Sequence, residues 1–245
     1  MDDRERLLVV VAHPDDESFG CGSVLARAEA DGYDTAVLCA TRGEAGESRI
    51  ATDDLAAVRE AELRAAATIL GVGTVRLLDH ADSGMTDEPP PGALVSVDAE
   101  VLSAEVEAIV AELRPDVVVT LDASDGHRDH AAIRDATLAA VDATDRPPAA
   151  VYLSCLARSS MSRWADRMRA TGSAEAYLAL SQLGTPDEDI TLSVDVAELL
   201  PLRWAAIRAH ASQTSPFEDL PPDLQHEFLA VDHLRLVRGD DLLRP

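Results

Sequence analysis

The sequence contains no lysine, so all 21 basic residues are arginines, and 45 acidic residues outnumber them. The formal net charge at pH 7 is −24. A surface this acidic repels nucleic acids and anionic membranes, which argues against polyanionic partners. A GC-rich genome, which favours arginine over lysine, is the simpler explanation of the composition. Adaptation to high salt, which screens such a surface, is the alternative.

Long apolar segments are also missing. No apolar stretch reaches 18 residues, so we expect no membrane-spanning helix. Residues 1–6 are highly charged, and the apolar run behind them is short and ends in a polar motif. This pattern favours a retained strand over a secretory signal.

Cysteine is scarce. Cys21, Cys39 and Cys155 are odd in number, widely spaced and set in apolar surroundings. The pattern predicts buried free thiols, which are typical of proteins in a reducing cytoplasm, so a cytoplasmic location is expected. A zinc-binding role for Cys21 is a weaker alternative.

The first 155 residues alternate apolar strand-like runs with helical patterns, as in repeated βα units. Strands are predicted over residues 7–12, 35–40, 75–78, 116–121 and 149–154, and helices over about 18–30, 53–70, 98–113 and 130–141. Four such crossovers imply a mostly parallel, doubly wound sheet. The sequence therefore predicts an α/β fold, a Rossmann-like three-layer sandwich.

After Pro148 the alternation changes. Helices are predicted over residues 159–170, 174–183 and 197–210, and strands over 190–194 and 231–237. A length of 245 residues suits one large domain. We expect residues 1–245 to form a single domain, with a Rossmann-like core over 1–155 and a C-terminal cap and substrate-entrance region over 156–245 that covers the active-site side.

Two short polar motifs follow predicted strands. His13-Pro14-Asp15-Asp16-Glu17 comes directly after the first strand, and Gly126-His127-Arg128-Asp129-His130 after the fourth. Because open α/β sheets bind ligands at the carboxyl ends of their strands, we expect both motifs to reach one site. Histidine and carboxylate side chains there suit zinc, with a spare carboxylate as a base. A single His-Asp pair would more often be a solvated loop.

These motifs resemble those of the PIG-L/LmbE superfamily of zinc-dependent N-deacetylases. The resemblance runs from about residue 7 to residue 214 and also includes residues 41–47, 59–63, 70–73, 82–85 and 210–213. It is greatest to the branch that deacetylates the glucosaminyl-inositol precursor of mycothiol or cleaves mycothiol conjugates.

The resemblance implies a metal held by His13, Asp16 and His130, with a water in an open position. The residues alone favour the same ligand set, in which only one of the two carboxylates binds the metal. The adjacent Asp15 and Asp16 cannot comfortably both bind one ion from a tight turn. Asp15 is then the general base and later the acid that protonates the leaving amine.

Two further residues of the second motif have predicted catalytic roles. His127 is a candidate hydrogen-bond donor to the developing oxyanion. Asp129 is expected to orient an imidazole, with a helix N-cap as a compatible alternative. Glu17, in the first motif, is expected to cap the following helix or brace the turn.

The resemblance also implies substrate contacts. Arg59, Glu44 and Asp82 match positions associated with sugar or inositol hydroxyls, although a surface salt bridge with Glu60 or Glu62 is the alternative for Arg59. His210 and Gln213 are expected to line the pocket; the alternative for His210 is a helix C-terminus.

One residue departs from the mycothiol branch, which carries a tyrosine where this chain has Asp125. An extra carboxylate would disfavour an oxyanion, so we expect Asp125 to point away from it.

The sequence thus predicts a metal-dependent amide hydrolase that deacetylates an N-acetylglucosamine-containing or related small molecule. Zn²⁺ is the expected cofactor, with Fe²⁺ as an alternative, because two imidazoles among three ligands disfavour magnesium and phosphoryl transfer. The expected partner is an N-acyl amino sugar, with homo-oligomerisation left open. The alternatives are an amidase for a larger thiol conjugate or acylated antibiotic intermediate, which a wider pocket after residue 155 would favour, and a catalytically weak metal- or sugar-binding homologue.

Overall fold

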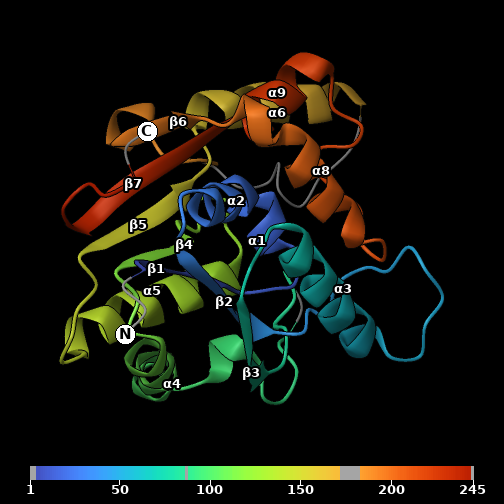
Figure 1. Ribbon diagram of the computed structural model, residues 1–245. Helices are drawn as coiled ribbons and strands as arrows, with labels where there is room; N and C mark the ends of the chain where they lie inside the picture. The colour runs from blue at the N-terminus through green and yellow to red at the C-terminus, as the bar shows by residue number, and fades with distance from the viewer. Residues whose placement is uncertain (1–3, 86–87, 172–182, 244–245) are drawn as a thin grey trace.

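The computed structural model describes residues 4–85, 88–171 and 183–243. One seven-stranded sheet runs through the molecule in the order β3-β2-β1-β4-β5-β7-β6 (Figure 1). Its strands are β1 (Arg6–Val11), β2 (Asp34–Thr41), β3 (Thr74–His80), β4 (Val117–Leu121), β5 (Ala150–Cys155), β6 (Leu192–Asp195) and β7 (Val231–Gly239). Strands β1 to β5 pair in parallel, whereas β7 runs antiparallel to both β5 and β6. The predicted mostly parallel α/β sheet is confirmed.

Strand β1 is apolar from Leu7 to Val11, and both of its faces are covered. Leu7, Val9 and Val11 belong to the core on one side of the sheet. Leu8 and Val10 belong to a second core on the other side. The alternation of side chains along a strand thus splits one apolar run between two cores.

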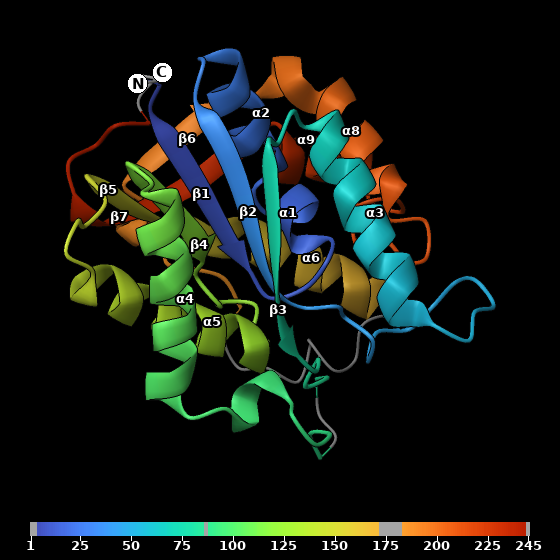
Figure 2. The same cartoon turned by 60° about the horizontal axis from the view of Figure 1, so that its bottom comes forward.

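Helices cover the sheet on both faces, which confirms the three-layer sandwich. Figure 2 shows α4 (Ala99–Leu113) and α5 (Arg128–Ala143) on one side, and α3 (Leu55–Ile69) and α8 (Leu200–Ala209) on the other. Helix α2 (Gly22–Ala30) packs against β1, β2 and α8 on the latter side. Local signals place two of these helices: the Asp54 carboxylate caps α3 by accepting from the Ala57 N–H, and Asp98 caps α4 in the same way.

The helix predicted over residues 18–30 is wrong as a single element. The chain forms a short helix α1 (Asp16–Phe19) and then α2, with Gly20 and Cys21 between them. Helix α1 therefore begins inside the first polar motif and carries Asp16 at its first position. Similarly, α5 begins two residues before the predicted start at residue 130, so that His130 lies in its first turn.

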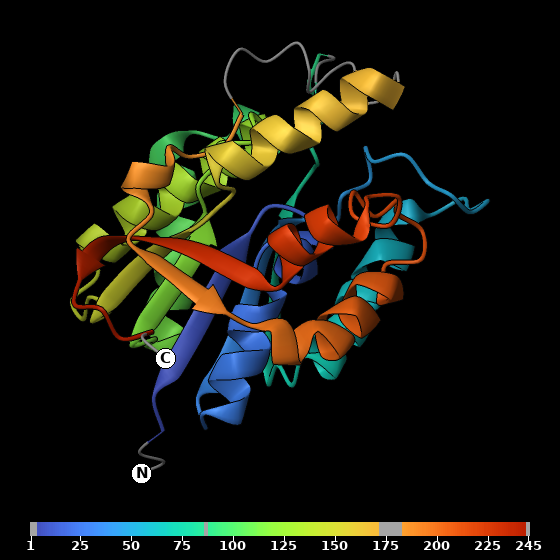
Figure 3. The ribbon, with the colours of Figure 1, turned by 90° about the horizontal axis from the view of Figure 1, so that it is seen from above.

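The C-terminal part extends the sheet past β5 with β7 and β6. Besides α8 it adds the helices α6 (Arg158–Thr171) and α9 (Pro222–Leu229) (Figure 3). Helix α9 lies in a segment for which the sequence pattern predicted no helix. The helix predicted over 174–183 lies almost entirely outside the described residues. Within residues 4–85, 88–171 and 183–243, no helix has the length and apolar character needed to cross a membrane.

Candidate active site and metal centre

The two polar motifs meet at the point where the direction of the sheet reverses. Strands β1 and β4 are neighbours, but the chain leaves β1 towards β2 and leaves β4 towards β5. The crevice between their carboxyl ends is where open α/β sheets bind ligands. His13 follows β1, and His127 and His130 follow β4. The sequence therefore brings its two clusters together as expected.

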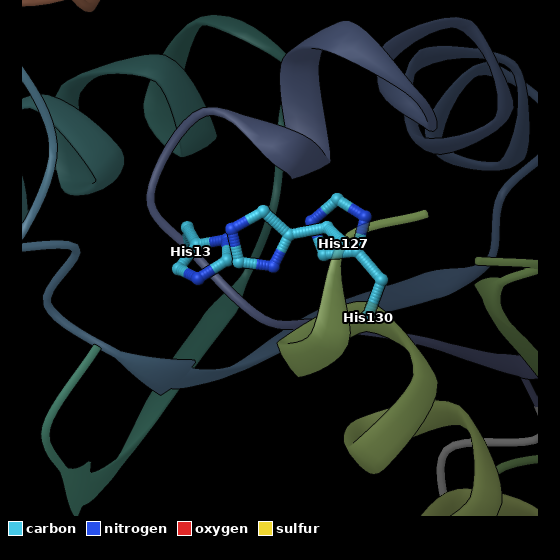
Figure 4. Close-up of side chains that lie close together, drawn as sticks. All are labelled: His13, His127 and His130. Carbon is cyan, nitrogen blue, oxygen red and sulfur yellow. The ribbon is translucent and has the colours of Figure 1, made fainter. Parts of the chain in front are cut away.

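Three imidazole rings gather in this crevice (Figure 4). The ring centroid of His127 lies 4.6 Å from that of His13 and 4.7 Å from that of His130. The ring centroids of His13 and His130 are 5.3 Å apart. One nitrogen from each ring can be chosen so that all three lie within 4.8 Å of one another. Such a triplet of imidazole nitrogens is a candidate metal-binding group.

Asp16 links two of these rings. Its Oδ2 lies 3.4 Å from His13 Nδ1 and its Oδ1 lies 3.3 Å from His130 Nε2. The same carboxylate accepts a 2.8 Å hydrogen bond from the His13 backbone N–H, which holds it in the turn. His13, Asp16 and His130, the predicted metal ligands, are therefore in mutual contact through Asp16. Their role as ligands stays a prediction.

Two further carboxylates, those of Asp129 and Asp82, lie near the other nitrogen of the His13 ring. His13 Nε2 is 3.1 Å from Asp129 Oδ2 and 3.5 Å from Asp82 Oδ1. Asp129 also accepts from the Ser83 N–H at 2.9 Å, and its Oδ1 is buried with no hydrogen-bond partner among the described residues. Burial opposes ionisation of Asp129, but the hydrogen bonds from His13 and Ser83 together outweigh it and hold the pKa below its usual range. His13, Asp82 and Asp129 form a further group that could hold a cation.

His127 is placed by the start of α5. It is the N-cap residue, and its Nδ1 accepts from the Asp129 N–H at 3.2 Å. This bond assigns the proton of the neutral ring to Nε2. Burial, together with the nearby His13 and His130, lowers the pKa of His127 to about 4. His127 is therefore a neutral hydrogen-bond donor at neutral pH, and the predicted N-cap role of Asp129 falls to His127 instead.

Asp15 lies in a strained turn at the edge of the crevice. Its φ is 119°, in a region that non-glycine residues rarely adopt. Arg59 donates to its Oδ2 at 3.0 Å and also to the Pro14 carbonyl. Burial raises the pKa of Asp15 to about 7, although the Arg59 charge opposes this shift. A carboxyl group that titrates near neutrality suits a general base.

The alternative of a surface salt bridge for Arg59 is wrong. The side chain is buried, and it also donates to the Gly43 carbonyl at 2.5 Å. The fit is close, because a Cβ atom at Gly43 would lie 2.4 Å from Arg59 Cζ. Glu60 instead pairs with arginines on the surface. Arg59 therefore ties the loop after β2 to the turn that carries Asp15.

Glu17 holds the first motif in place through buried hydrogen bonds. It is fully buried, and its Oε2 accepts from the Asp15 backbone N–H at 2.9 Å. Its Oε1 lies 2.7 Å from His210 Nε2 and accepts from the Ser18 hydroxyl. The expectation that His210 lines the pocket is corrected here. His210 is buried behind the turn and is not part of the cavity wall; its Nε2 contacts Glu17.

The crevice opens into one cavity of about 450 Å³. Arg59, Asp82 and Gln213 form part of its wall. Glu44 and His210 do not contribute to the wall. Glu44 is exposed, and its Oε1 accepts from the Asp82 N–H at 3.1 Å. On the far side, the wall comes from β5 and from residues after 155, which confirms that the C-terminal part caps the active-site side.

The composition of the crevice fits a bound cation. Carboxylates outnumber positive groups there, with Asp15, Asp16, Asp82, Asp125 and Asp129 around the three imidazoles. In a low-dielectric cleft, such an excess of carboxylates attracts a cation. Imidazole with carboxylate is the ligand chemistry of zinc or iron rather than magnesium.

A doubly wound sheet with histidines and carboxylates at its switch point defines a Rossmann-like α/β protein with a candidate metal site. The chain belongs to the PIG-L family, whose model, described as GlcNAc-PI de-N-acetylase, matches residues 8–141. A relative from Geodermatophilus obscurus, named 1D-myo-inositol 2-acetamido-2-deoxy-alpha-D-glucopyranoside deacetylase, is 35% identical over 96% of this chain and 92% of its own length.

Two solved structures share the fold. N,N'-diacetylchitobiose deacetylase from Pyrococcus horikoshii superposes with a TM-score of 0.62 at 19% identity, covering 96% of this chain and 84% of that one. The 4-carboxy-2-hydroxymuconate hydratase from Pseudomonas putida superposes with a TM-score of 0.64 at 17% identity, covering 98% and 99%. The fold therefore occurs with more than one chemistry, and the site must decide the reaction.

Proposed function

We propose that the protein is an amide hydrolase that removes the acetyl group from a small molecule containing N-acetylglucosamine. The full-length similarity to a deacetylase of an acetamido sugar supports the substrate class. The observation that carries the proposal is the gathering of His13, Asp16, His127 and His130 in one cavity beside Asp15. An α/β hydratase shares the fold, but it is only 17% identical.

In the proposed mechanism, Asp15 accepts the proton of the attacking water and later gives it to the leaving amine. Its raised pKa, at about 7, lets one carboxyl group do both near neutral pH. His127, neutral and protonated at Nε2, donates a hydrogen bond to the oxyanion that develops on the amide carbonyl. Asp129 contacts His13 Nε2 and so orients that ring with its Nδ1 towards Asp16.

The residues that would hold a metal are His13, Asp16 and His130. We propose zinc as the ion, with iron as the alternative. When bound, such an ion supplies Lewis-acid chemistry and lowers the pKa of water to about 7. Arg59 and Asp82, which lie in the cavity wall, are proposed to contact the sugar hydroxyls. Because Cys21, Cys39 and Cys155 are buried and free, we also propose that the enzyme works in a reducing cytoplasm.

The test combines metal analysis with acetate release. Purified protein is assayed by elemental analysis and then with N-acetylglucosamine glycosides, including an inositol-linked one, before and after chelation. We expect bound zinc or iron, loss of acetate release on chelation, and recovery when the metal is restored. Full activity in the metal-free sample would contradict the metal dependence. No acetate release by the metal-loaded protein from any glycoside would contradict the deacetylase proposal itself.

A further inference from the structure

Aromatic side chains are rare in this chain and gather in one place. The sequence contains three phenylalanines and two tryptophans. All three phenylalanines, Phe19, Phe217 and Phe228, line the cavity that holds the candidate metal site, as does Trp164. Only 3% of the residues are aromatic, and most of the large apolar rings thus lie around the candidate active site.

The three phenylalanine rings contact one another in a row that starts at the metal-site turn. Phe19 lies in α1, one helical turn after Asp16. Its ring centroid is 5.8 Å from that of Phe217 in an edge-to-face contact, and Phe217 is 6.0 Å from Phe228. These separations are typical of aromatic packing. The apolar surface therefore begins within a turn of Asp16 and extends away from it.

Three of the rings remain open to solvent in part, although they pack against a small core that includes Phe217. Phe19, Trp164 and Phe228 are each partly exposed, and Met161, which also lines the cavity, lies one turn before Trp164 on α6. We define the apolar chamber as Phe19, Met161, Trp164, Phe217 and Phe228. Two polar residues beside it, Ser160 and Glu227, are hydrogen-bonded to each other at 2.5 Å, which leaves the surface facing the cavity largely apolar.

We infer that the apolar chamber binds an alkyl or aryl group of about six or more carbons, carried on the same molecule as the scissile amide. The inference rests on the proposed amide hydrolysis and specifies its substrate class. An acetyl group is the smallest acyl group with a carbon chain, and a cavity of 450 Å³ lies within the range of sites for much larger ligands. Arg59 and Asp82, the proposed sugar contacts, line the same cavity but do not belong to the apolar chamber, so the chamber is left for a different portion of the substrate.

The apolar group can belong either to the glycoside or to the acyl part of the substrate. Two substrate series distinguish these cases. In the first series the amide is N-acetyl and the glycoside changes from methyl to butyl, hexyl and octyl. In the second the glycoside is methyl and the acyl group changes from acetyl to butanoyl, hexanoyl and octanoyl. Each fully buried methylene contributes about 0.8 kcal/mol, or about fourfold. We expect kcat/KM to rise at least 30-fold from the first to the last member of one series.

Binding is measured alongside turnover by calorimetry with metal-loaded protein. A flat response of both kcat/KM and affinity in both series would overturn the apolar chamber while leaving the deacetylase proposal intact. If no compound is hydrolysed, the deacetylase proposal fails, yet a tighter Kd for octyl than for methyl glycoside would still support the chamber. An equal Kd for the two glycosides, and for the two acyl compounds, would overturn it.

Substitutions test whether the dependence of kcat/KM on alkyl length arises in the apolar chamber. Trp164→Ala and the milder Phe228→Leu are each expected to lower the octyl-to-methyl ratio of kcat/KM by fivefold or more. Leu202→Ala is the matched control, because Leu202 is an apolar side chain of α8 that is 37% exposed and outside the cavity wall. It should leave the ratio unchanged. An unchanged ratio in both chamber variants, with both folded by circular dichroism, would overturn the assignment.

Discussion

Asp125 holds His130 by a 2.6 Å contact between its Oδ2 and the ring Nδ1. Its other oxygen accepts from the His127 backbone N–H at 3.0 Å. One carboxylate therefore spans the second motif and leaves His130 Nε2 directed at Asp16, 3.3 Å away. A carboxylate on the far nitrogen of a ligating histidine fixes its tautomer and orientation. The residue that replaces the tyrosine of the mycothiol branch thus contacts a predicted metal ligand, His130.

We expect Asp125→Asn to weaken metal affinity by about 10- to 100-fold, because the amide holds the His130 ring less firmly. Competition with a chromogenic chelator measures the affinity. Asp135→Asn is the control, since Asp135 is an exposed aspartate on α5, the helix that carries His130. Equal metal affinity in Asp125→Asn and the unchanged protein would mean that this contact does not support the site.

Substitution should distinguish the proposed general base of the first motif from a proposed metal ligand. Asp15→Asn is expected to keep the metal and lose at least about 100-fold in kcat, because the base is removed while the backbone φ of 119° remains accessible to asparagine. His13→Ala should lose both metal and activity. Metal content and kcat are measured on the same preparations. Comparable metal loss in the two variants would argue against the division of roles.

The buried His210 is expected to matter for stability more than for substrate binding. His210→Ala leaves the fully buried Glu17 carboxylate with one partner fewer, so the free energy of unfolding should fall by about 3 kcal/mol. Urea denaturation measures this, and KM should change less than twofold. His226→Ala, an exposed histidine on α9, is the control. A raised KM with unchanged stability would instead indicate that His210 touches the substrate.

The cysteine thiols should be inert in the folded protein. Burial raises the pKa of Cys21 to about 12, and it raises the pKa values of Cys39 and Cys155 as well. The reactive thiolate is therefore almost absent at pH 8. We expect a disulfide reagent to label fewer than one thiol per chain within an hour at pH 8, and all three in denaturant. Rapid labelling of the native chain would show that a thiol is accessible.

Local sequence patterns predicted the parts of the fold that depend on neighbouring residues. The apolar run of β1 and the Asp54 cap of α3 need only a few adjacent side chains to be recognised. The break between α1 and α2 was missed, although Gly20 follows α1 and Gly22 begins α2, and glycine is unfavourable within a helix. Helix α9 was missed as well, since it depends on packing in a small core with Phe217 and Ile207.

The candidate site, like the fold, was predictable from the sequence only in part. The positions of His13 and His130 after two parallel strands already placed them at one edge of the sheet. The partner of His210 could not be read from the sequence, because Glu17 is 193 residues away and nothing local marks the pair. Nor could the contact of Asp125 with His130, which depends on α5 beginning at Arg128.

By itself, the sequence determined that this chain builds a parallel α/β sheet with histidines and aspartates at two strand ends. Strand and helix periodicity, together with the carboxyl-end rule, act through the backbone and need no knowledge of distant contacts. Only the tertiary structure decided which carboxylate faces which ring and which histidine is buried behind the site. It also gathered the few aromatic rings around the cavity, because such contacts join elements that the chain order keeps far apart.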